Sequence, residues 1–359
     1  MEKENRLFYV DNLRVALTIL VIAHHVGQAY GPTGGYWPVQ EAARAALLGP
    51  FFTVNRSFFM SLFFMISGYF MVMAYEHNGP GAFLKSRLMR LGVPFLVYGA
   101  VMIPLRIFMF GEHISRWDQL VNTGHLWYIQ HLLLFSLGYA LWRWIRRNRP
   151  QRDKSSARVP GTLAILAFAV VLAAASAIVR IWSPIDRWLN LLGFFGVAFA
   201  DVPRDLAFFI IGAVAFPRDW FKRYPARSGH VWLGVGLTAA ALRYAVSLWL
   251  HQLLPWTATV MEVAYPLWES ILCCGMCIGL LILFRETLNV QGRLGKLLAS
   301  GQYAAYVWHP LLIVPLQMAI AGLQSPPFAK FVIITAVGVP IVFLWSGLSR
   351  QPRFVRAVL

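Results

Sequence analysis

Charged residues and cysteines are both scarce in this sequence. Asp, Glu, Lys and Arg make up 13% of the 359 residues, about half of the share that is usual in soluble domains. Hydrophobic residues make up 58%, so a water-soluble enzyme of this size is not expected. The three cysteines are too few for a disulfide scaffold.

Two common kinds of site are also missing from the sequence. No glycine-rich stretch follows a predicted strand and carries the lysine of a phosphate-binding loop. Cys274 and Cys277 have the spacing of zinc ligands, with Cys273 beside them, but they lie in an apolar run without a second pair of ligands. We therefore expect small buried thiols and no metal site.

Long apolar runs are what the sequence has instead. Crossing a bilayer takes roughly 20 apolar residues per helix. Such runs predict an all-α bundle of about ten transmembrane helices, at residues 13–29, 57–75, 88–110, 125–145, 160–182, 192–216, 231–250, 262–284, 300–322 and 328–348. The sixth run contains Asp201, Pro203 and Asp205. It predicts either a broken helix or a short re-entrant segment before a span that starts near Leu206.

The basic residues are sorted along the chain rather than spread evenly. Of the 32 Lys and Arg residues, 23 lie in the N-terminal segment, in alternate loops and after the last run, and five lie in the other loops. Cytoplasmic loops are enriched in Lys and Arg, so both termini are predicted to be cytoplasmic. The formal charge of +17 is then a topology signal, and no nucleic-acid partner is expected.

The domain organisation is predicted to be simple. No linker is long enough to separate a second domain, so residues 1–359 are expected to form one transmembrane domain without a soluble extra domain. The first run lacks a cleavage site and is expected to stay in place. The outer loop near 31–56 either packs over helix ends or forms a lid for an acceptor, and Glu41 to Leu48 could form a short interfacial helix.

Ionisable residues inside the first run are candidates for function, because burying them in a membrane costs roughly 2.5–3.5 kcal/mol each. Arg14 and His25 are eleven residues apart, which places them on one helical face and about 16 Å apart along the axis. Arg14 is then near the cytoplasmic surface and His25 beyond the midplane. The alternative to a functional role is, for Arg14, a helix-end arginine that snorkels to the surface and, for His25, a structural histidine. His24 points about 100° away and is expected to be structural.

Five segments, in order, resemble motifs of the membrane-bound acyltransferase-3 family. The first is Tyr9-Val-Asp-Asn-Leu-Arg14 followed after ten residues by His25. The others are FFMISGYF at 63–70, RLMRLGVP at 87–94, HLWY at 125–128 and YAAYVWHP at 303–310. The resemblance spans nearly the whole chain, and its specificity comes from the order of the five motifs rather than from any single one.

The resemblance implies transfer of an acyl group, commonly acetyl or succinyl, from acyl-CoA to a hydroxyl of a sugar or glycan. Such enzymes are multi-pass proteins of the bacterial inner membrane, so the expected partners are acyl-CoA, a carbohydrate acceptor and the lipid bilayer. The Asp-Asn-Leu-Arg form of the opening motif also resembles the branch that succinylates periplasmic glucans.

The residues themselves permit a mechanism of this kind. Acyl-CoA is a polyanion, and Arg14, Arg87 and Arg90 are predicted to bind its phosphates near the cytoplasmic face; the alternative for the last two is the positive-inside signal alone. His25 is predicted to act as general base on the acceptor hydroxyl. Ser67 is the nearest candidate for a covalent acyl intermediate, although a Ser-Gly pair more often serves close helix packing.

Several residues are candidates for the acceptor side of the reaction. His125 begins the fourth run on the predicted outer side, where interfacial packing is its alternative. Glu269 is an intramembrane charge that needs a partner, either a histidine or Arg243. His309 is either an acceptor-side residue or a packed structural histidine. Asp201 and Asp205 either bind sugar hydroxyls or cap a helix.

Two other functions remain open from the sequence. A transporter or flippase of a glycan or lipid would also use intramembrane His, Arg and Glu residues. A membrane scaffold would have no need for Arg14 and His25 on one face, nor for the cytoplasmic arginines. Acyl-CoA binding and turnover separate the acyltransferase from both.

Overall fold

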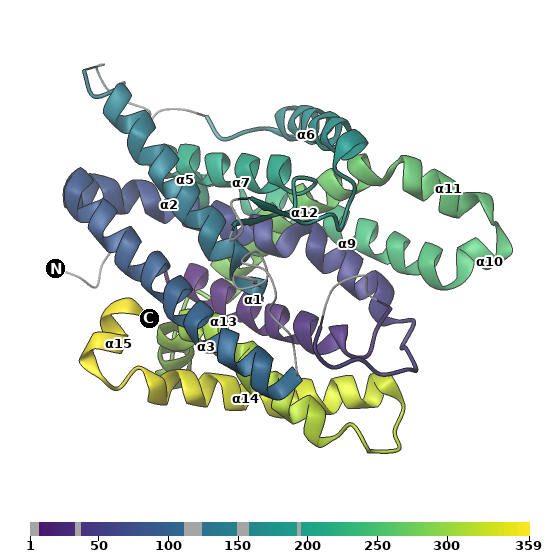
Figure 1. The fold of residues 1–359 in the computed structure, drawn as a ribbon. Coiled ribbons are helices and arrows are strands. Elements are labelled where there is room, and N and C mark those ends of the chain that lie inside the picture. Colours follow the sequence, from purple (N-terminus) through teal and green to yellow (C-terminus); the bar gives the residue numbers. More distant parts are fainter. Residues whose placement is uncertain (1–6, 33–36, 111–123, 149–157, 192–194) are drawn as a thin grey trace. The chain divides into compact units, whose positions relative to one another are not determined.

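The computed structural model describes residues 7–32, 37–110, 124–148, 158–191 and 195–359 (Figure 1). The chain forms two compact units, each built from separate stretches of sequence. The first unit contains Met1–Phe63, Pro160–Ala174 and Phe221–Gln351. The second contains Phe64–Val159, Ala175–Trp220 and Pro352–Leu359.

Most of the described chain is helical. The longer helices are α1 (Phe8–Gln28), α2 (Leu48–Arg87), α3 (Val93–Phe110), α5 (Trp127–Ile145), α6 (Thr162–Trp182), α7 (Val202–Ala215), α9 (Ala226–Ala245), α12 (Tyr265–Thr287), α13 (Arg293–Ala319) and α14 (Pro327–Ser349). The shorter ones are α8 (Trp220–Arg223), α10 (His251–Leu253), α11 (Trp256–Val263) and α15 (Arg353–Val358).

Six helical segments of the described chain are long and apolar enough to cross a bilayer. They are Phe8–Gln28, Leu48–Val101, Thr162–Trp182, Ala226–Leu253, Tyr265–Thr287 and Pro327–Ser349. This confirms a helical protein with several membrane-spanning segments. The count of ten spans and the cytoplasmic placement of both termini stay predictions.

The second and third predicted spans lie on one nearly continuous helical path. α2 is interrupted at Gly79, whose φ of +74° is open to glycine but rarely to other residues. Pro80 follows and cannot donate a helical hydrogen bond. Between α2 and α3 the chain forms a π-helical turn, Leu88–Gly92.

The sixth predicted span differs from its prediction. Two short strands, β1 (Leu189–Leu191) and β2 (Phe195–Val197), pair antiparallel. β2 lies in the first half of the run, for which a broken helix or a re-entrant segment was predicted. Helix α7 begins only at Val202, with Pro203 in its first turn, where a missing N–H is tolerated. The run is therefore interrupted before Val202, whereas residues 202–205, which were predicted to break it, belong to the helix. The 14 residues of α7 span about 21 Å, which is shorter than a bilayer core.

The loop between α1 and α2, predicted to be an outer loop, also differs from one of its predictions. Residues 41–47 form turns and bends, and no interfacial helix forms before α2 begins at Leu48. Backbone N–H groups of this segment donate to the end of α1 instead: Glu41 to the Ala29 carbonyl at 3.0 Å and Ala45 to the Tyr30 carbonyl at 2.7 Å. These bonds replace the local i to i−4 pattern that a helix requires.

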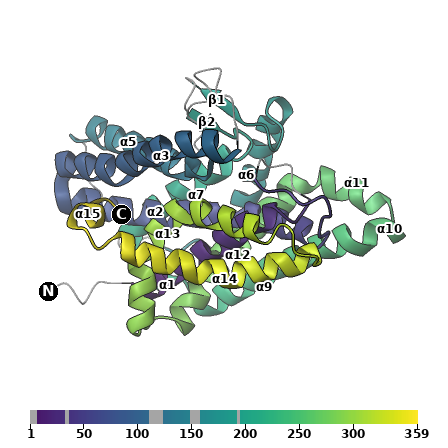
Figure 2. The ribbon, with the colours of Figure 1, turned by 60° about the horizontal axis from the view of Figure 1, so that its bottom comes forward.

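Helices of the first unit approach closely through glycine. α9 packs along α12, and a methyl group on Gly236 would lie 2.8 Å from the backbone nitrogen of Met276. α1 contacts α12, α13 and α14, an arrangement that can be followed in Figures 1 and 2. In the second unit, Gly68 of α2 and Gly212 of α7 lie against backbone carbonyls of the opposing helix. Close packing is thus the observed role of Gly68, as the Ser-Gly pair predicted.

Candidate active site

A line of polar contacts joins α1 to α13 within the first unit. Gln302, with its amide oxygen turned toward Arg14, accepts from Nε and Nη1 of that arginine at 3.3 Å. Farther along both helices, His25 and His309 are hydrogen-bonded. The two helices therefore run in the same direction. The prediction that Arg14 and His25 share one face is confirmed, because both side chains contact α13.

The two histidines form the centre of this line. Nε2 of His309 lies 3.1 Å from Nδ1 of His25, and the ring centroids are 4.9 Å apart. His309 is fully buried and His25 is half-buried. Nδ1 of His25 also lies 3.0 Å from the Val21 carbonyl, and Nδ1 of His309 lies 2.8 Å from the Tyr306 carbonyl.

These contacts determine where the ring hydrogens lie when both histidines are neutral. A carbonyl oxygen can only accept, so each Nδ1 carries a hydrogen. Nε2 of His309 then has a lone pair and accepts from His25. Nε2 of His25 carries the other lone pair, so this atom is the basic nitrogen of the pair.

Proline at position 310 explains why the Tyr306 carbonyl is available to His309. In a regular helix the carbonyl of residue 306 accepts from the backbone N–H of residue 310. Pro310 lies inside α13 and has no N–H. The carbonyl accepts from the His309 ring instead, so the His-Pro pair orients the imidazole that supports His25.

The loop between α1 and α2 covers His25 through Trp37. The two rings are stacked with centroids 5.5 Å apart and planes inclined by 29°. Trp37 Nε1 donates to Gln317 Oε1 at 2.7 Å, and Gln317 Nε2 donates to the Val26 carbonyl at 3.0 Å. Of the two predictions for this loop, packing over the helix end is the one observed.

A buried ion pair holds the same loop to α14. Nζ of Lys330 lies 2.7 Å from Oε1 of Glu41 and donates to the Ala321 carbonyl at 3.2 Å. Only 3% of the Lys330 side chain is exposed. Tyr30, which precedes this part of the loop, is buried, and burial together with the negative charge of Glu41 raises its pKa to about 12.

His24 and Glu269 occupy other parts of the first unit. The His24 ring packs against Phe52 and Phe59, each 5.1 Å away between centroids, as expected for a structural histidine. Glu269 lies near the start of α12 and is 2% exposed. The Arg243 guanidinium lies 6.0 Å from the ring centroid of the adjacent Trp268. Pairing of Glu269 with Arg243 or a histidine stays a prediction.

The remaining predicted site residues belong to the second unit. Arg87 ends α2 with its guanidinium 5.1 Å from the Phe83 ring centroid. Arg90 is exposed and lies in the π-helical turn. His125 is buried in the 3-10 turn before α5, with its ring 5.0 Å from that of Tyr98.

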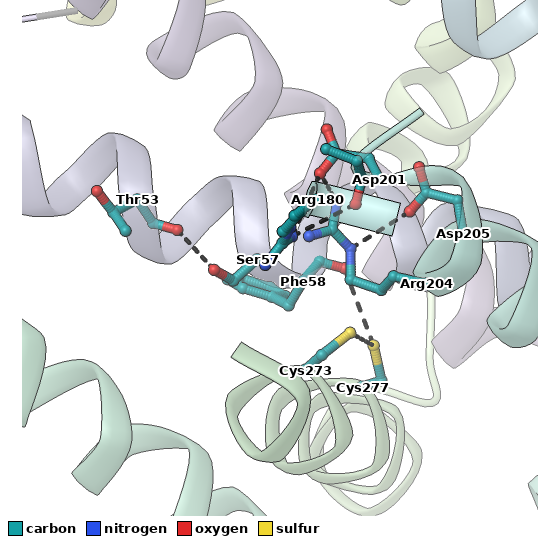
Figure 3. Close-up of polar contacts among 10 residues, drawn as sticks. Thr53, Ser57, Phe58, Arg180, Asp201, Arg204, Asp205, Cys273 and Cys277 are labelled. Atoms are coloured by element: carbon teal, nitrogen blue, oxygen red, sulfur yellow. Dashed lines mark hydrogen bonds and ion pairs between the residues drawn. The ribbon is translucent and has the colours of Figure 1, made fainter. Parts of the chain in front are cut away.

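A charged cluster lies at the start of α7 in the second unit (Figure 3). Nη2 of Arg204 lies 3.2 Å from Oδ1 of Asp201, and its Nε lies 3.5 Å from Oδ1 of Asp205. Arg180 is 4.0 Å from Asp201. Asp201 occupies the N-cap position but makes no side-chain capping bond, so the capping role is wrong for this residue. It pairs with arginine instead.

The three cysteines are free, buried thiols, as predicted. Sγ of Cys273 lies 3.9 Å from Sγ of Cys277, and Figure 3 draws this contact. Within the described part of the chain, no group of three or more His, Cys, Asp or Glu side chains is arranged to hold a metal ion.

Sequence reasoning missed two glutamines at this site. Gln302 and Gln317 lie in the same helix as His309 and contact Arg14 and Trp37 respectively. The spacing could have indicated that Gln302 lies on the same helical face as His309, because it precedes His309 by seven residues, which is close to two helical turns. Uncharged amides in an apolar helix attract less notice than charges, although they too require partners there.

Helices that are long and apolar enough to cross a membrane, together with the sequence relationship below, place the chain in the class of membrane acyltransferases. Residues 7–346 match the family described as an acyltransferase domain, and the chain belongs to this family, acyltransferase-3.

Among curated proteins, the chain is similar to the protein called "Glucans biosynthesis protein C" of Salmonella schwarzengrund, Salmonella typhi and Salmonella typhimurium. Each is 25% identical over 285 residues, which covers 73% of this chain and 72% of the relative. No solved structure matches.

Proposed function

We propose that this protein is an O-acyltransferase of the bacterial inner membrane. It transfers an acyl group of the acetyl or succinyl class from cytoplasmic acyl-CoA to a hydroxyl of a glycan. The observation that carries the proposal is the His25–His309 pair, since it leaves a neutral imidazole with its lone pair on Nε2 in a chain of the acyltransferase family.

In the proposed reaction, Nε2 of His25 takes the proton from the acceptor hydroxyl. The hydroxyl oxygen attacks the thioester carbonyl, the C–O bond forms and the C–S bond breaks. The CoA thiolate leaves and receives the proton from the His25 imidazolium. Base catalysis of this kind typically contributes 10²–10⁴-fold.

His309 is a positioning residue in this scheme. While His25 holds the extra proton, its Nδ1–H still donates to Nε2 of His309 at 3.1 Å. The His309 ring is in turn held by its bond to the Tyr306 carbonyl. The positive charge on His25 is therefore stabilised by an oriented neutral acceptor, much as a carboxylate orients the histidine of a hydrolase triad.

The donor requires cations for its phosphates, and Arg14, Arg87 and Arg90 are proposed to supply them. Arginine forms bidentate hydrogen bonds with phosphate and keeps its charge at all physiological pH values. Gln302 supports this role for Arg14, because its contact holds the guanidinium at the side of α13.

The acceptor is proposed to be a glucan, which is supported by the printed name of the Salmonella relatives. His125 and Glu269 remain the proposed acceptor-side residues. His309 is proposed to serve the base rather than the acceptor, because it is fully buried and both of its ring nitrogens are engaged.

Purified protein in proteoliposomes tests the proposal. With acetyl-CoA or succinyl-CoA and a glucose oligosaccharide, we expect release of free CoA and a matching mass increment on the sugar. Failure to acylate the sugar from either donor contradicts the proposal. Movement of labelled oligosaccharide across the bilayer without acyl-CoA identifies a transporter instead.

Replacing Arg87 or Arg90 with alanine is expected to weaken acyl-CoA binding about tenfold, because each change removes a charge-assisted phosphate contact. Equilibrium binding of labelled acetyl-CoA to the purified variants measures the effect. Arg158→Ala is the control, since this exposed arginine lies in a predicted cytoplasmic loop outside the motif. Unchanged affinity in both Arg87→Ala and Arg90→Ala refutes the phosphate assignment.

Replacing His309 with glutamine is expected to lower kcat at least tenfold while KM for acyl-CoA stays close to that of the unmodified protein. The reason is that His25 loses the neutral acceptor that stabilises its protonated form. Steady-state kinetics separate the two constants, and thermal unfolding checks that the variant is folded. A purely structural role for His309 predicts a lower unfolding temperature with kcat per folded molecule unchanged.

A further inference from the structure

A cleft that the sequence did not predict lies entirely within the second unit. It is bounded by the start of α5, by the chain around the β1–β2 hairpin and by the start of α7. Its lining residues are Trp127, His131, Trp188, Ala198, Asp201, Val202 and Asp205. The lining thus combines two indole rings, two carboxylates and one imidazole.

The aromatic side of the cleft is formed by two tryptophans. The rings of Trp127 and Trp188 meet edge to face, with centroids 5.8 Å apart and planes inclined by 65°. Trp188 is 47% exposed, although an indole ring of this size is usually buried. An exposed, oriented indole face suits a flat apolar surface such as the C–H face of a pyranose ring.

His131 adds a hydrogen-bond acceptor to the cleft. Its Nδ1 lies 2.7 Å from the Trp127 carbonyl, so this nitrogen carries the hydrogen of the neutral ring and Nε2 carries the lone pair. The side chain is 5% exposed and lines the cleft. No hydrogen bond to Nε2 is formed by the described residues.

The carboxylates of Asp201 and Asp205 are held in place by arginine. Arg204 is buried and contacts one oxygen of each, and Arg180 approaches Asp201 (Figure 3). The four side chains carry no net charge together. Carboxylates and a neutral imidazole accept hydrogen bonds, and the cleft has a volume of about 10 Å³, which is room for roughly one water-sized group. Its polar side therefore favours a hydroxyl of a neutral ligand.

We propose that the indole of Trp188, at the edge of this cleft, stacks against a sugar unit of the glycan acceptor, and that one hydroxyl of this sugar enters the cleft and donates to Asp201, Asp205 or His131. The assignment rests on the proposed function. A sugar offers an apolar ring face to Trp188 and a small hydroxyl to the cleft, whereas the phosphates of CoA would meet two carboxylates. The predicted topology puts the start of the fourth span and the end of the fifth on the outer side, where an envelope glycan lies.

Direct binding of a short radiolabelled glucose oligosaccharide, by equilibrium dialysis without acyl-CoA, tests this assignment. Trp188→Ala is expected to weaken binding about tenfold, the effect of losing one aromatic stacking contact of roughly 1.4 kcal/mol. Trp188→Phe keeps an aromatic face and is expected to stay within about threefold of the unmodified protein. The same ranking is expected in KM for the sugar.

Trp144→Ala is the matched control, because Trp144 is 59% exposed, belongs to α5 in the same unit and lies away from the cleft. It is expected to leave binding unchanged. Equal affinity of Trp188→Ala and the unmodified protein overturns the sugar site, as does absence of binding by the unmodified protein. Acyl transfer is measured separately, so a protein that transfers but ignores position 188 refutes this site and leaves the proposed function standing.

Discussion

Replacing His25 with glutamine is expected to lower the rate of acyl transfer by about 10²–10⁴-fold, the usual contribution of a general base. Glutamine fills a similar volume and is polar, but its amide cannot take a proton from the acceptor hydroxyl. Affinity for acyl-CoA is expected to stay close to that of the unmodified protein, because the proposed phosphate ligands are elsewhere. Single-turnover transfer and equilibrium binding of acetyl-CoA measure the two effects independently.

His24→Gln provides a matched control for this experiment. It changes the same residue type one position earlier in α1, where the ring packs among phenylalanines rather than against His309. Its transfer rate is expected to stay within a few-fold of the unmodified protein. Equal loss in both variants indicates damage to α1 in general, and near-normal turnover by His25→Gln rules out the base.

Replacing Lys330 with methionine is expected to destabilise the protein by about 3 kcal/mol, at the lower end of the range for breaking a buried ion pair. Methionine keeps the length of the side chain but leaves Glu41 without its 2.7 Å partner. The lower end applies because the Glu41 side chain remains 21% exposed. Unfolding in detergent with increasing denaturant measures the loss.

A double variant identifies the source of this loss. If the unpaired Glu41 carboxylate is responsible, Glu41→Gln combined with Lys330→Met is expected to recover much of the stability. Lys296→Met is the control, since Lys296 is an exposed lysine of the same unit. Equal losses in Lys330→Met and the double variant mean that the unpaired Glu41 carboxylate is not the source of the loss.

The sequence contained enough to predict part of the candidate site. Eleven-residue spacing placed Arg14 and His25 on one face, and that face does meet a partner helix. The identity of the partner helix could not be predicted. His309 is 284 residues from His25, and the spacing of residues within one helix does not indicate which other helix packs beside that helix. Trp37 was likewise visible only as an aromatic residue in a loop.

The prediction of local structure was wrong where a short apolar run fits both a helix and a strand. The stretch around Phe195 is apolar and was predicted to belong to a broken helix or a re-entrant segment, but it forms a strand. A run of this length does not distinguish the two by periodicity. At residues 41–47, contacts of the loop backbone with the end of α1 outweighed the local tendency to form a helix.

The distance in sequence between His25 and His309 also sets an order of events during synthesis. At 5–20 residues per second, the separation of 284 residues takes on the order of tens of seconds to translate. Throughout that interval the first helix holds Arg14 and His25 without Gln302 and His309. Unpaired ionisable groups in an apolar segment are costly, so a chain cut before Arg293 would leave its first helix permanently in that state.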